Sequence, residues 1–157
     1  MGDIQYGLAW QDSYRLGDKK VDAQHRQLFE LLSELIKSCM DDSVAKKLHV
    51  TLEFLVDYTV KHFYDEESLQ VQTNYPDYRR HKQLHEDFKV TVGEIVEKFD
   101  RDGSSEELSN DLNKIVAQWL VKHITVEDKK IGEYLREIEK RNDFDYLRMK
   151  SEARRIS

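Results

Sequence analysis

The clearest helical pattern in this chain lies in residues 48–69, LHVTLEFLVDYTVKHFYDEESL. Seven of these residues recur at alternating intervals of four and three, which is the spacing of a helix face that packs in a bundle. They are Leu48, Leu52, Leu55, Thr59, His62, Glu66 and Leu69. Near the end of this face an imidazole and a carboxylate take core positions. The segment therefore predicts a buried helix that places polar side chains in the protein interior.

The same spacing recurs in three other segments. The first face consists of Val21, His25, Leu28, Leu32, Leu35 and Cys39. The next consists of His81, His85, Phe88, Val92, Ile95 and Phe99. The last segment is less regular, with two adjacent stripes through Leu112, Val116, Trp119, His123 and through Leu120, Ile124, Asp128, Ile131. Four such faces predict four packed helices.

Few residues interrupt these patterns, because the chain of 157 residues has one proline and six glycines. Ser104 and Glu107 have the spacing of a capping box at the start of the last helix. Short connections make neighbouring helices antiparallel. We therefore expect an all-α, up-down-up-down antiparallel four-helix bundle over residues 19–140. A non-helical N-terminal arm, residues 1–18, precedes it with Trp10 as a packing anchor, and a polar C-terminal extension, residues 141–157, follows it.

Composition limits the class of function. The net charge is −6 with 36% charged residues, which disfavours nucleic acid as a partner because phosphate binding needs a basic surface. The single cysteine, Cys39, excludes an internal disulfide framework and a cysteine-based metal cage, and no apolar run is long enough to span a membrane. We expect a cytoplasmic protein without a membrane partner.

Five of the six histidines and two carboxylates form a set of candidate metal ligands. The set is His25, His62, Glu66, His81, His85, His123 and Asp128. In the predicted bundle all seven fall roughly 23 to 35 Å from the end that carries the 40–43 and 100–104 turns, at 1.5 Å per residue. Four helices of independent length rarely agree in this way by chance. Spacing alone does not pair His123 with Asp128, because residues five apart lie about 140° from each other round an ideal helix.

The mixture of ligand types points to iron. Imidazole suits iron, zinc, copper or nickel, and carboxylates readily bridge two cations. We expect two iron ions bridged by Glu66, Asp128 and a solvent-derived oxo or hydroxo group. Five histidines then divide three and two, so one ion keeps a vacancy for a small ligand. Two other metal sites are disfavoured. A zinc protease helix would need a second histidine four residues after His85, and the sequence has lysine there. Ferritin-like oxidases need a glutamate three residues before a histidine, and no histidine of this chain has one.

With this set assembled, the chain strongly resembles the hemerythrins. The matching stretches are Trp10, 22–29 (DAQHRQLF), 62–67 (HFYDEE), 75–85 (YPDYRRHKQLH) and 119–128 (WLVKHITVED). The resemblance implies reversible dioxygen binding at a non-haem di-iron centre. It implies that His81, His85 and His123 hold the closed iron, that His25 and His62 hold the open one, and that small anions such as azide bind there too. It also implies an apolar pocket walled by Leu28, Phe63, Trp119, Leu120 and Ile124.

Several uses of such a centre remain open at this point. Oxygen storage, delivery and sensing all fit. The alternatives are a di-iron enzyme acting on peroxide or nitric oxide, and a signalling module that passes a shape change to residues 137–157. No further acid–base cluster beside the site is visible in the sequence, which disfavours an enzyme. The C-terminal extension is a candidate contact for a protein partner.

Overall fold

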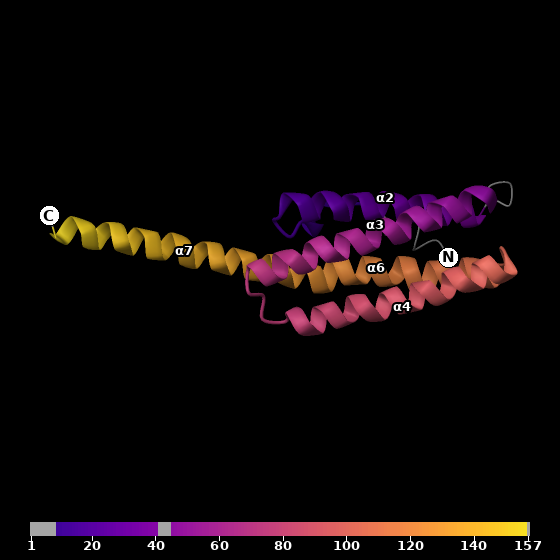
Figure 1. Cartoon of the computed structure of the whole chain (residues 1–157). Coiled ribbons are helices and arrows are strands. Elements are labelled where there is room, and N and C mark those ends of the chain that lie inside the picture. The colour runs from indigo at the N-terminus through magenta and orange to yellow at the C-terminus, as the bar shows by residue number, and fades with distance from the viewer. Residues whose placement is uncertain (1–8, 41–44, 157) are drawn as a thin grey trace.

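The computed structural model describes residues 9–40 and 45–156, and every regular element in these ranges is helical. Helix α2 spans Lys19–Met40, α3 spans Ala45–Gln72 and α4 spans Tyr78–Asp102. Together with a fourth helical rod they form an antiparallel bundle (Figure 1). The prediction of an all-α four-helix bundle is confirmed.

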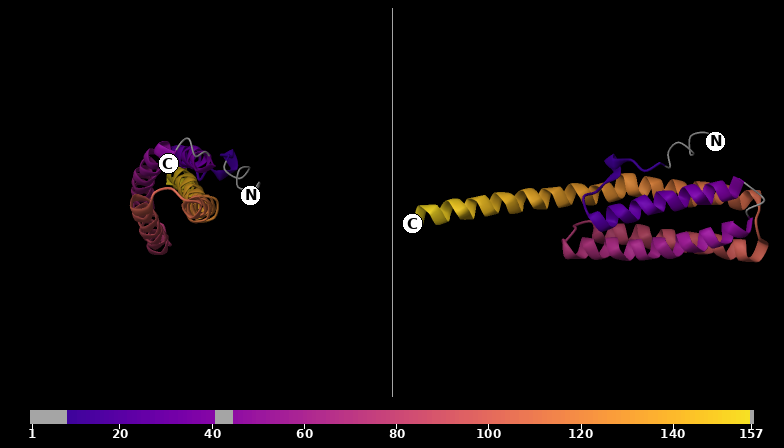
Figure 2. Two further views of the ribbon diagram at one scale, coloured as in Figure 1. Left: turned by 90° about the vertical axis from the view of Figure 1, so that its right-hand side faces the viewer. Right: turned by 90° about the horizontal axis from the view of Figure 1, so that it is seen from above.

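The fourth rod is continuous but not uniform. It consists of α5 (Glu106–Asp111), η3 (Leu112–Ala117), α6 (Gln118–Lys122), η4 (His123–Asp128) and α7 (Lys129–Ile156). Both η3 and η4 are π-helical, so each winds more loosely than an α-helix. Beyond the bundle α7 continues as a projecting helix, which the views from the side and from above both show (Figures 1 and 2).

The start of this rod differs by one residue from the prediction. The N-cap is Ser105, not Ser104, and its hydroxyl accepts a hydrogen bond from the backbone amide of Leu108 at 3.0 Å. Because the helix begins at Glu106, Leu108 takes the third helical position, where a free amide needs such an acceptor.

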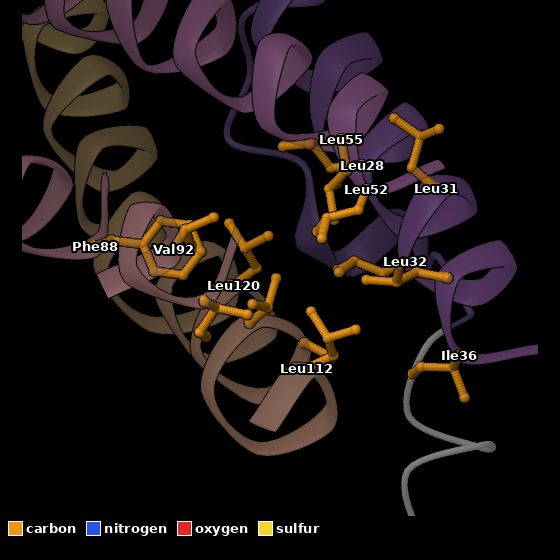
Figure 3. Close-up of a cluster of buried hydrophobic side chains, with 14 of the residues drawn as sticks. Leu28, Leu31, Leu32, Ile36, Leu52, Leu55, Phe88, Val92, Leu112 and Leu120 are labelled. Atoms are coloured by element: carbon orange, nitrogen blue, oxygen red, sulfur yellow. The ribbon is translucent and has the colours of Figure 1, made fainter. Parts of the chain in front are cut away.

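The bundle interior is built from the predicted apolar faces. Leu28 and Leu32 of α2, Leu52 and Leu55 of α3, and Leu120 of α6 are all at most 1% exposed. Figure 3 shows these leucines projecting into the interior from opposite sides of the bundle. The polar members of the same faces therefore also point inward.

The turn between α3 and α4 closes the bundle near those polar residues. Asn74 adopts a left-handed backbone with φ of 56°, and the amide of Tyr75 donates to the carbonyl of Gln70 at 2.8 Å, which ends α3. From α7 the hydroxyl of Tyr134 donates to the carbonyl of Thr73 at 2.7 Å. The turn is thus tied to the fourth rod.

The N-terminal arm packs against the bundle, and the part of it before residue 9 lies outside the described residues. It is not wholly non-helical, because Asp12–Tyr14 form one 3-10 turn, η1. This turn brings the rings of Trp10 and Tyr14 to 5.7 and 5.5 Å from that of Phe29. Leu16 is buried, and a Cβ atom on Gly132 would lie 2.6 Å from its carbonyl oxygen.

No helix in the described part of the chain has both the length and the apolar character needed to cross a membrane.

Candidate metal centre

The structure brings all seven candidate ligands into one buried cluster, each at most 4% exposed. His25 comes from α2, His62 and Glu66 from α3, His81 and His85 from α4, and His123 and Asp128 from η4. Their donor atoms form two groups, and within each group all atoms lie within 4.8 Å of one another. The larger group is Glu66, His81, His85, His123 and Asp128. The smaller is His25, His62, Glu66 and Asp128.

The two carboxylates belong to both groups because their oxygens face in different directions. Glu66 Oε1 lies 2.8 Å from His81 Nε2 and 3.3 Å from His85 Nε2, whereas its Oε2 lies 3.1 Å from the Nε2 atoms of His25 and His62. Asp128 Oδ1 lies 3.0 Å from His81 Nε2 and 3.1 Å from His123 Nε2, and its Oδ2 lies 3.0 Å from His25 Nε2. Each carboxylate therefore presents one oxygen to each group.

The donor atoms are arranged for binding cations rather than for hydrogen bonding to one another. Neither oxygen of Asp128 accepts a hydrogen bond from a described residue, although three imidazole nitrogens are within 3.1 Å. His85 Nε2 and His123 Nε2 face each other at 3.0 Å. Two imidazole nitrogens can share one proton in this position, or both can bind a cation placed between them and the carboxylates. The residues present thus fit a site for two metal ions.

The π-helical turn of η4 explains how His123 and Asp128 reach the same cluster. On an α-helix residues five apart diverge by about 140°, but a π-helix has an i to i+5 repeat and brings them to one side. In the structure their side chains meet at 3.1 Å. Sequence spacing alone left this pair unexplained, and the widened turn supplies the reason.

Other side chains hold the imidazoles in position, and sequence reasoning missed them. His62 Nδ1 lies 2.8 Å from Gln24 Oε1, and Gln24 Nε2 donates to Asp65 Oδ2 at 2.7 Å. His85 Nδ1 lies 3.2 Å from Glu67 Oε1. A histidine that donates through Nδ1 keeps Nε2 free for a metal. The one sequence signal is that Gln24, Asp65 and Glu67 each adjoin a candidate ligand in the chain, which does not specify the imidazole that each one contacts.

Aromatic rings cover the three-histidine side of the cluster. Phe63 stacks on His85 with ring centres 3.8 Å apart, and Trp119 stacks on His123 at 4.5 Å. The other predicted wall residues, Leu28, Leu120 and Ile124, are each at most 1% exposed and belong to the same hydrophobic core as Phe63. Two aromatic rings thus contact the polar cluster directly, and the other three predicted wall residues belong to the buried core of the bundle.

When the cluster holds no metal, its carboxylates and imidazoles shift one another's pKa. Burial alone would lower the pKa of His25 and His81, but contacts with Asp128 and Glu66 outweigh it and raise the pKa to about 9 and about 10 respectively. Burial would raise the pKa of both carboxyls, and the surrounding imidazoles instead hold the pKa of Glu66 and of Asp128 well below the usual range. For His62 burial and then the charge of His25 lower the pKa. The carboxylates are therefore anionic, ready to bind cations.

Comparison with known proteins decides the family. The family model described as "Hemerythrin HHE cation binding domain" matches residues 16–135 of this chain. The chain belongs to the hemerythrin family. All seven clustered side chains and the aromatic cover lie inside the matched range.

Relatives within the hemerythrin family include bacterial and animal proteins. A bacteriohemerythrin of Stenotrophomonas maltophilia is 32% identical over 124 residues, which cover 78% of this chain and 77% of that protein. A myohemerythrin of Riftia pachyptila is 28% identical and covers 78% of this chain and 88% of that protein. A solved structure of wild-type hemerythrin superposes with a TM-score of 0.65 at 27% identity, over 72% of this chain and 85% of that one. The bundle is thus that of the family, and α7 continues beyond the residues that the family model matches.

Proposed function

We propose that the cluster holds two iron ions and that this centre binds dioxygen reversibly. The observation that supports this most directly is the orientation of Glu66 and Asp128, each with one oxygen on either side of the cluster. Such carboxylates bridge two cations. A solvent-derived oxo or hydroxo group completes the bridge in this proposal, and membership of the hemerythrin family favours iron.

The unequal number of histidines would give the centre one open position. His81, His85 and His123 would hold one iron together with the carboxylates, and His25 and His62 would hold the other, with room for one further small ligand. When bound, the iron pair supplies electrons and a place for a small ligand such as dioxygen or azide. The chain's own residues position the iron pair, set the polarity of its surroundings and exclude water from it.

The roles of the chain's own residues follow from their contacts. Gln24 accepts a hydrogen bond from Nδ1 of His62 and thereby aims Nε2 at the open side. Glu67 does the same for His85 on the closed side. Leu28, Leu120 and Ile124, with Phe63 and Trp119, wall the pocket in this proposal. A dry apolar wall disfavours the charge separation and proton entry that lead to irreversible oxidation.

Reversible binding is favoured over turnover of peroxide or nitric oxide. Besides the candidate ligands, the buried side chains with polar groups among the described residues are the uncharged Gln24, Thr51, Thr59 and Gln70, and Tyr75, whose ring lies 6.3 Å from that of His81. Cleavage of an oxygen–oxygen bond needs a group that delivers protons at the site. The amides and the threonine hydroxyls do not titrate, and burial raises the pKa of Tyr75 to about 12, so none of these groups delivers a proton near neutral pH. Storage, delivery or sensing of oxygen in the cytoplasm is the role we propose. Signalling through α7 is the second candidate, because that helix continues directly from η4 and projects beyond the bundle from about residue 139.

The proposal is tested by cycling the iron-loaded protein between oxygen and its removal. The protein is reduced without oxygen, exposed to oxygen and then purged, while the optical spectrum is followed through several cycles. We expect an oxygen-dependent charge-transfer band that disappears on purging and returns with little loss. Irreversible bleaching in the first cycle would contradict reversible binding, and steady consumption of peroxide or nitric oxide would instead identify an enzyme.

A further inference from the structure

The projecting part of α7 exposes apolar side chains that have no role in the bundle. Every residue from Glu139 to Ile156 is exposed, a length of roughly 27 Å at 1.5 Å per residue. Figures 1 and 2 show this segment standing clear of the other helices. Its large apolar residues are 63 to 89% exposed: Phe144, Tyr146, Leu147, Met149 and Ile156. Because large apolar side chains gathered on an exposed surface often mark a contact, such residues indicate a packing partner.

One largely apolar face of α7 runs from the bundle into the projecting segment, with Asn142 as its polar member. Inside the bundle it includes buried Ile131 and half-buried Leu135 and Ile138. It then continues at intervals of four, four, three, four and three residues through Asn142, Tyr146, Met149, Ala153 and Ile156. At 100° per residue these positions share one side of the helix, whereas Phe144 and Leu147 lie on the other side. The face of Tyr146 and Met149 is therefore the one with a coiled-coil pattern.

The charges of the projecting segment are divided along its length. Residues 138–145 carry three acidic and two basic side chains, a net charge of −1. Residues 146–156 carry four basic and one acidic side chain, a net charge of +3. A parallel pair of such helices would place like charges together, whereas an antiparallel pair places the acidic half of one against the basic half of the other. The segment is thus complementary to itself in the antiparallel orientation only.

We propose that residues 138–156 form an antiparallel two-helix contact with the same segment of a second copy of this chain. With the twofold axis between residues 147 and 148, Tyr146 lies opposite the partner's Met149, and Asn142 lies opposite the partner's Ala153. Ile156 lies opposite the partner's Glu139, one residue past Ile138 at the base of the projection. Beside this apolar face Asp143 approaches the partner's Lys150. A twofold contact uses the same surface on both copies, so it closes as a dimer.

This pairing holds two bundles at opposite ends of a short rod. The contact spans fewer than three heptads, so its area is at the low end for specific interfaces and the dimer is expected to dissociate on dilution in the micromolar range. The inference does not depend on iron or oxygen. It would remain valid if the proposed function were wrong.

The test is sedimentation equilibrium of the full chain and of two matched double variants. Tyr146→Glu with Met149→Glu places charges on the proposed contact face. Phe144→Glu with Leu147→Glu adds the same charges to the opposite face, at residues with nearly the same exposure, 66% and 63% against 64% and 67%. We expect the natural chain and the control to approach twice the 18.7 kDa chain mass with rising concentration, and the first variant to stay monomeric. Helix content by circular dichroism should be equal in all three.

Cross-linking then tests the orientation. In a background with Cys39→Ser, a mixture of Asn142→Cys and Ala153→Cys chains should form a disulfide-linked dimer, while Asn142→Cys alone should not. The dimer should also weaken as salt is added, because exposed opposite charges are screened. A natural chain that stays monomeric at all concentrations, loss of the dimer in the Phe144 and Leu147 variant instead, or efficient cross-linking of Asn142→Cys with itself would each overturn the proposal.

Discussion

His123 and Asp128 lie five residues apart in the chain, yet their side chains meet at 3.1 Å inside the bundle. The π-helical turn η4 makes this contact possible, since it rotates Asp128 back onto the side of His123. Asp128 then faces both groups of the cluster, as Glu66 does from α3. The two carboxylates are the only side chains common to both groups.

Iron stoichiometry should therefore depend on which ligand is removed. Asp128→Asn removes a ligand from both groups and should lose most iron, whereas His25→Ala removes one from the smaller group alone and should retain about one iron per chain. Iron is measured by elemental analysis of purified protein. Glu133→Gln, an exposed acidic site on α7, is the matched control and should bind as the natural chain does. Equal iron loss in the His25 and Asp128 variants would show that the two groups are not separate sites.

Metal uptake should release protons and strengthen with pH. Without metal, the pKa of His25 is raised to about 9 and that of His81 to about 10, so both rings are protonated at pH 7. A metal binds only the neutral imidazole, so uptake at pH 7 should release at least two protons per chain, and affinity should rise until the pH passes these pKa values. Calorimetry of Zn²⁺ or anaerobic Fe²⁺ binding in two buffers of different ionisation enthalpy counts the protons. An enthalpy that is the same in both buffers would contradict protonated rings.

The pocket wall should affect oxygen chemistry without affecting iron content. Leu120→Val shortens one proposed wall residue, and Leu112→Val makes the same change at an equally buried leucine earlier in the rod. Each should cost about 1 kcal/mol of stability, because one buried methylene is removed. Only the Leu120 variant should show faster oxygen release or autoxidation. The measurement is decay of the oxygenated spectrum, and equal decay in both variants would remove Leu120 from the wall.

The close approach of the arm to α7 should make Gly132 sensitive to substitution. A Cβ at Gly132 would lie 2.6 Å from the Leu16 carbonyl oxygen, whereas one at Gly93 of α4 would meet no atom within 4 Å. Gly132→Ala should destabilise by about 1–3 kcal/mol through overpacking. Gly93→Ala should stabilise by roughly 0.5–1 kcal/mol, because alanine favours the helix. Urea denaturation of both variants gives the two free energies, and a stable Gly132→Ala protein would show that the arm is not docked there.

Much of the fold was predictable because apolar periodicity reports directly on which helix faces are buried. The faces through Leu28 and Leu52 are buried as the pattern predicts. The meeting of seven polar side chains was also foreseeable, since it depends only on helix rise and turn position. Their metal roles stay a prediction.

The missed features depend on local detail of the backbone and of side-chain rotamers. A π-helical turn has no composition signal, so the contact of His123 with Asp128 could not be read from a spacing of five. The start of the last helix shifted from Ser104 to Ser105, because both serines suit an N-cap and packing decides between them. The supports Gln24 and Glu67 depend on rotamers that spacing does not specify.

The most direct test of the proposed centre is a crystal structure of the iron-loaded, oxidised protein with azide. We expect two irons, bridged by Glu66 and Asp128, with azide on the iron that His25 and His62 hold. That result would locate the open position where dioxygen is proposed to bind. A single metal ion in the cluster, or azide on the iron held by His81, His85 and His123, would contradict both the division of the histidines and the oxygen-binding function inferred from it.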